Sequence, residues 1–110
     1  MSMRDDYRPR VMELIGTLMR QAIEITAGGQ VEVSVDYAGH VDTVSIDIHR
    51  CACDRGIKTP REQRLMRDRQ RLSPYDPDMT QYAKAHWEET IATLNRWHDY
   101  LTELQMQLGD

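Results

Sequence analysis

The last third of the chain carries an unbroken heptad pattern, which constrains the fold more than any other feature of the sequence. Steps of four and three residues keep side chains on one face of an α-helix that can pack along a neighbour. The pattern predicts a helix from about Pro77 to Leu108, with Asp76 as its N-cap. Its edge must be covered by the domain or by a partner subunit. The repeating positions are Ala83, Trp87, Thr90, Leu94, Trp97, Leu101, Leu104 and Leu108.

A second amphipathic helix is expected near the N-terminus. Pro9 fits a first helical turn, and Gly28-Gly29 supplies the positive-φ freedom that ends a helix. Between them, apolar side chains recur every three or four residues and share one face. These are Val11, Leu14, Ile15, Leu18, Ala22 and Ile25.

Two runs of alternating apolar and polar residues, 31–36 and 44–49, predict a β-hairpin. A connecting loop of two or four residues places every aliphatic side chain on one face, whereas a three-residue loop does not. An even-length loop is therefore expected, and it would pair Val33 with Val44. The apolar face needs a cover, and the N-terminal helix is the simplest one.

The segment between the hairpin and the C-terminal helix is basic. Residues 54–72 carry seven basic and three acidic side chains, although the whole chain has a net charge of −4. Thr59-Pro60-Arg61-Glu62 combines an N-cap, a first-turn proline and a capping-box glutamate. We therefore predict a short, solvated basic helix from about Pro60 to Leu72.

These segments predict a single α+β domain over residues 1–110, in the order α-β-β-α-α. An antiparallel β-hairpin packs on the N-terminal helix, and the basic helix and its connector occupy 54–76. Because a two-stranded sheet is marginal by itself, we expect hairpins from two subunits to pair into a four-stranded sheet. The prediction is therefore a homodimer.

Two groups of side chains are candidate partner-binding residues. Arginine binds phosphates and carboxylates through its two-pronged guanidinium group. On a helix, Arg69 points away from the other arginines of the basic segment. The exposed hairpin tip supplies an aromatic ring and an imidazole. The predicted residues are Arg61, Arg64, Arg67 and Arg71 in the basic segment, and Tyr37 and His40 at the tip.

Metal binding and catalysis are not favoured by the sequence. His49, Cys51 and Cys53 are residue types that bind zinc, but they lack paired Cys-x2-4-Cys knuckles. The preferred alternative is that they are ordinary residues near a strand end. The chain has no phosphate-binding glycine loop and no nucleophile elbow. We predict no metal, no cofactor and no enzymatic activity.

The leading hypothesis is a small, cytoplasmic, non-catalytic interaction or regulatory protein that binds a protein partner. The alternative is a nucleic-acid-associated accessory protein that contacts the phosphate backbone through the arginine-rich segment 55–71. A membrane role is not expected, because no apolar run approaches the length of about 18 residues that spans a bilayer.

Overall fold

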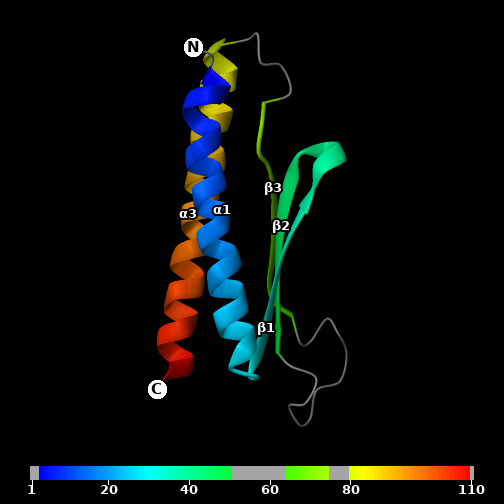
Figure 1. The fold of residues 1–110 in the computed structure, drawn as a ribbon, viewed down its shortest axis with the longest axis vertical. Coiled ribbons are helices and arrows are strands. Elements are labelled where there is room, and N and C mark those ends of the chain that lie inside the picture. Colours follow the sequence, from blue (N-terminus) through cyan, green and yellow to red (C-terminus); the bar gives the residue numbers. More distant parts are fainter. Residues whose placement is uncertain (1–2, 51–63, 75–79, 110) are drawn as a thin grey trace.

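The computed structural model describes residues 3–50, 64–74 and 80–109 and has an α+β fold (Figure 1). The three strands form one antiparallel sheet in the order β1-β2-β3. The order of main elements is α-β-β-β-α, so the predicted α+β class is confirmed. In chain order the elements are α1 (Met3–Ala27), β1 (Val31–Ala38), the short 3-10 helix η1 (Gly39–Val41), β2 (Thr43–Arg50), β3 (Arg64–Arg71) and α3 (Thr80–Gly109).

The two long helices lie side by side on one face of the sheet (Figure 1). They run in the same direction because an odd number of antiparallel strands separates them. At one end the rings of Tyr7 and Trp87 stack at 6.1 Å, and toward the other end Gln21 Nε2 donates to Thr102 Oγ1 at 3.0 Å. The described residues thus form two layers with overall dimensions of 52 × 26 × 18 Å.

The predicted C-terminal helix is confirmed, and its heptad edge is buried within one chain. Leu94 and Leu101 are fully buried, and Trp87 and Trp97 are each 2% exposed. Leu104 is also buried, and Leu108 packs against the core while partly exposed. The edge is therefore the core of this fold, and the tryptophans are unavailable for contact with a second subunit.

Helix α1 ends as expected, but it begins earlier than Pro9. Gly29 adopts a φ of 84°, which only glycine adopts without strain, and the amide of Gly28 donates to Ile25 O at 3.1 Å. Because α1 starts at Met3, Pro9 lies inside the helix rather than in its first turn. Proline cannot donate the backbone hydrogen bond that this interior position normally makes.

The predicted hairpin is confirmed, with a different pairing. Residues 39–42 form an even-length connection, so the aliphatic side chains of β1 and β2 share the buried face, as expected. Val33 pairs with Ile48, not with Val44. The connection at 39–42 is centred two residues later in the chain than the predicted one, and a shift of two residues changes the partner of each side chain but not the face to which it points.

The predicted basic helix at 60–72 is wrong for the residues that are described, because 64–71 form strand β3. Thr59, Pro60 and Glu62, which suggested a helix start, lie outside the described residues. A strand here pairs with the backbone groups along the second edge of β2, which a solvated helix would leave without partners. It also aligns Met66 with Ile48 on the core side.

Strand β3 also changes the expected sheet. The four-stranded sheet from two subunits was predicted because a lone hairpin is marginal, but a third strand of the same chain occupies one edge of the hairpin. Among the described residues, β1 and β3 remain the edge strands. None of the described helices is both long and apolar enough to cross a membrane.

Candidate functional site

The face of the sheet that the helices leave uncovered is the main candidate site. Successive side chains of a strand point to opposite faces, so the buried Val31, Val33 and Val35 place their neighbours on the outer face. The register aligns these neighbours with polar side chains of the other two strands. The outer face carries Glu32, Ser34 and Asp36 from β1, Thr43, Ser45, Asp47 and His49 from β2, and Arg67, Arg69 and Arg71 from β3.

An open hollow of about 800 Å³ lies on this outer face, toward the hairpin turn. Its lining includes Asp36 and Asp47 as well as Arg67 and Arg69. Arg67 is the cross-strand neighbour of Asp47, and Arg69 is the neighbour of Ser45. Asp68 of β3 also lines the hollow, but its carboxylate accepts from Trp97 Nε1; the other carboxylates of the lining lie on β1 and β2 and its guanidinium groups on β3.

Asp47 is the centre of a polar cluster on this face. Its Oδ1 atom lies 3.2 Å from His49 Nε2 and 3.6 Å from Arg64 Nε. The same oxygen is buried from solvent and makes no hydrogen bond of good geometry among the described residues, so these two contacts are its polar neighbours. Both side chains contact Asp47 while remaining partly exposed to solvent.

Because residues 64–71 form a strand, the arginines that were predicted to bind a partner together have different surroundings. Arg64 is engaged with Asp47, and Arg71 donates to Val41 O at 2.9 Å and to Ser73 O at 3.0 Å, so both help to hold the fold. Arg67 and Arg69 are exposed and share the outer face. The expectation that Arg69 points elsewhere, which assumed a helix, is wrong. Arg61 lies outside the described residues.

The two predicted residues of the hairpin tip have different settings. His40 lies in η1 and is exposed at the rim of the hollow. Tyr37 belongs to β1, is half-exposed, and donates its hydroxyl to Asp42 Oδ1 at 2.6 Å. The hydrogen bond of its hydroxyl orients the ring of Tyr37, half of which stays exposed to solvent.

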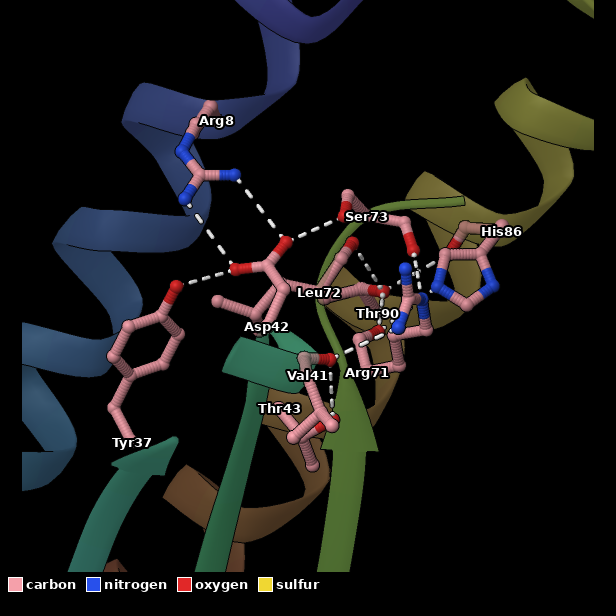
Figure 2. A network of polar contacts seen from close by, with 10 residues as sticks. All are labelled: Arg8, Tyr37, Val41, Asp42, Thr43, Arg71, Leu72, Ser73, His86 and Thr90. Carbon is pink, nitrogen blue, oxygen red and sulfur yellow. Dashed lines mark hydrogen bonds and ion pairs between the residues drawn. The ribbon is translucent and has the colours of Figure 1, made fainter. Parts of the chain in front are cut away.

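Asp42 organises a network that joins four parts of the chain (Figure 2). It adopts a left-handed conformation, with φ 47° and ψ 48°, which aspartate tolerates better than most residues. Its carboxylate accepts hydrogen bonds from Tyr37, from Ser73 and, at 3.4 and 3.5 Å, from Arg8. Its backbone oxygen accepts from the amide of Leu72 at 2.8 Å. We call Arg8, Tyr37, Asp42 and Ser73 the Asp42 clasp.

The clasp strongly favours a charged carboxylate. Partial burial by itself would raise the pKa of Asp42, but the hydrogen bonds from Ser73, Tyr37 and Arg8 outweigh it and lower the pKa to about 2. The hydrogen bond to Asp42 also raises the pKa of Tyr37. A carboxylate with so low a pKa is a weak base, so it does not activate the Ser73 hydroxyl as a nucleophile.

Polar contacts also join the inner side of β3 to α3. Asp68 Oδ2 accepts from Trp97 Nε1 at 2.9 Å, and Gln70 Nε2 donates to Thr90 Oγ1 at 3.1 Å. The backbone oxygen of Arg71 accepts from His86 Nε2 at 2.9 Å (Figure 2). These bonds explain why a strand with few apolar residues stays on the helical layer.

Within the ranges described, no group of three His, Cys, Asp or Glu side chains is arranged to hold a metal ion. His49 instead contacts Asp47, and Cys51 and Cys53 lie outside the described residues. No hydroxyl among the described residues hydrogen-bonds to His49, so the His49 and Asp47 pair is not joined to a nucleophile there.

The sequence prediction missed the Asp42 clasp, although the chain held a partial signal for it. Aspartate is common in turns because it tolerates the left-handed backbone conformation. No pattern in the sequence near Asp42 indicated its distant partners Arg8 and Ser73.

Comparison of the chain with protein-family models, curated proteins and solved structures found no match, so any functional assignment depends on the geometry described above.

Proposed function

We propose that this protein is a non-catalytic, cytoplasmic binding protein that receives a segment of a partner protein on the outer face of its sheet. The observation that supports the proposal is the hollow of about 800 Å³ on this face. The carboxylates of Asp36 and Asp47 line it on one side, and the exposed guanidinium groups of Arg67 and Arg69 line it on the other. A rigid surface with both signs of charge fits a polypeptide that presents acidic and basic side chains.

The same charge order disfavours nucleic acid as the partner. A phosphate backbone that contacted Arg67 and Arg69 would pass close to Asp36, which repels it, and to Asp47, whose charge Arg64 offsets only in part. Arg64 and Arg71 are occupied by contacts within the chain. Two free guanidinium groups beside two carboxylates make a weak phosphate-binding surface.

The test is capture of partners from a nuclease-treated lysate by three forms of the chain. The first is the wild type, and the second carries R67E and R69E. The third is a matched control with the same change in charge, K84E and R96E, on α3. A direct partner of the outer face is retained by the wild type and the control and lost by the R67E/R69E form. Equal retention by all three forms contradicts the proposal.

The nucleic-acid alternative is tested with the same proteins. Fluorescence anisotropy with labelled single- and double-stranded DNA and RNA is measured from about 50 to about 200 mM salt, where phosphate-dominated binding weakens steeply. Binding that shows this salt dependence and disappears in the R67E/R69E form, but not in the K84E/R96E form, would replace the protein-partner proposal.

A further inference from the structure

Helix α1 carries a stripe of exposed apolar side chains that the domain does not use. Met12, Met19 and Ile23 are 63%, 40% and 64% exposed. Together with Gly16 they are spaced by four, three and four residues, so they share one side of the helix. A Cβ atom at Gly16 would meet no atom within 4 Å, so the glycine leaves a notch in the middle of the stripe. We call these four residues the α1 stripe.

The stripe lies beside the free edge of β1. Thr26, on the same side of α1, accepts a hydrogen bond from the Val33 amide at 3.0 Å, and its hydroxyl lies 3.4 Å from Val33 O. Both backbone groups of Val33 therefore point away from β2, since paired residues of antiparallel strands either exchange both bonds or neither. No described strand lies beyond this edge, and the side chains of the stripe are exposed to solvent.

We propose that a second copy of this chain covers the α1 stripe, with the two α1 helices packed antiparallel about a two-fold axis. The stripe is symmetric about its own midpoint. In the antiparallel arrangement Met12 meets Ile23 of the other copy, and Met19 enters the notch at Gly16 of the other copy. Each contact occurs twice, as an interface between identical surfaces requires.

The charges beside the stripe favour the same arrangement. Glu13 and Arg20 are exposed and follow Met12 and Met19 on the solvent side of the stripe. Glu13 and Arg20 lie on the same flank of the stripe, and antiparallel packing brings these flanks together, so Glu13 lies close to Arg20 of the other copy, twice. Neither side chain has an ion-pair partner among the described residues, so both are free to pair across the axis.

The first experiment measures mass by sedimentation over a range of concentrations. The wild type is expected to associate to twice the 12.9 kDa mass of the chain. M19E puts a charge against the notch and is expected to weaken dimerisation by at least about tenfold. M106E is the matched control, because Met106 is 68% exposed on α3 and lies outside the stripe. A wild type that stays monomeric, or a dimer equally strong in M19E, overturns the proposal.

The second experiment tests the orientation by exchanging charges. E13R and R20E each place like charges together and are expected to weaken the dimer, and the double variant E13R/R20E is expected to restore it. Both residues are exposed, so folding, checked by circular dichroism, is expected to survive. Failure of the double variant to restore association contradicts the antiparallel pairing. The R67E/R69E form should dimerise normally, so this inference stands or falls independently of the proposed function.

Discussion

Replacing Asp42 with asparagine removes the charge at the centre of the Asp42 clasp with little other change. Asparagine has nearly the same shape, and it tolerates the left-handed backbone, with φ 47°, that Asp42 adopts. The substitution therefore tests the electrostatic contribution of the carboxylate and adds no backbone strain. The groups affected are the hydrogen-bond donors Arg8, Tyr37 and Ser73.

The magnitude follows from the pKa of Asp42. Its pKa in the folded chain is about 2, against 3.8 for an unperturbed aspartate. Its side chain is 17% exposed, so solvent screening is limited. At about 1.4 kcal/mol for each pKa unit, the ionised carboxylate stabilises the fold by about 2 kcal/mol at neutral pH. Because the folded-state pKa is the lower one, this contribution is complete above the unfolded pKa and is lost as the pH falls through the folded pKa.

The assay is urea denaturation of the wild type and D42N at neutral pH and at steps down to about pH 2. At neutral pH we expect D42N to be less stable by about 2 kcal/mol, and we expect the gap to close between about pH 4 and pH 2. D36N, which removes an exposed carboxylate from the same hairpin, should change the stability by less than about 0.5 kcal/mol. A gap of the same size at both ends of the pH range would refute the electrostatic explanation.

Three further predictions concern packing and backbone conformation, each measured by chemical denaturation at a protein concentration low enough to keep the chain monomeric. L101A removes most of a fully buried side chain and is expected to cost about 2–5 kcal/mol; a smaller loss would mean that the helical layer is loosely packed. W97F removes the N–H that donates to Asp68 and should cost about 1–3 kcal/mol, part of it from the smaller ring. G29A and G16A should change the free energy of unfolding in opposite directions. The first forces alanine to a φ of 84° and destabilises by about 1–2 kcal/mol, and the second adds a methyl group to an open helix position and stabilises by about 0.5–1 kcal/mol. Equal effects at the two glycines would contradict this reasoning.

The elements with a strong period were predictable from the sequence. The unbroken heptad steps predicted a long C-terminal helix, and α3 spans Thr80–Gly109. The alternation in 31–49 predicted which side chains of the hairpin are buried. The face to which a side chain points depends only on whether the connecting loop has an even or an odd number of residues. Register does not follow from parity, so the pairing of Val33 was predicted wrongly.

Strand β3 was not predictable in the same way. Its segment has few apolar residues, and its local signals, a proline and a capping glutamate, favoured a helix. What makes it a strand is the open edge of β2 and the bonds that Asp68 and Gln70 make with Trp97 and Thr90. These partners are distant in sequence, and no local pattern encodes them.

The candidate binding surface was also only partly predictable from the sequence. The sequence identified the arginines of 55–71 as the basic part of the chain, but only the strand conformation brings Arg67 and Arg69 together and commits Arg64 and Arg71 to internal contacts. The periodicities of this sequence determined two amphipathic helices and a hairpin, because burial of apolar side chains at fixed spacing is a local property. The tertiary structure decided the third strand, the parallel order of the helices and the Asp42 clasp, because each depends on groups that meet only after the chain has folded.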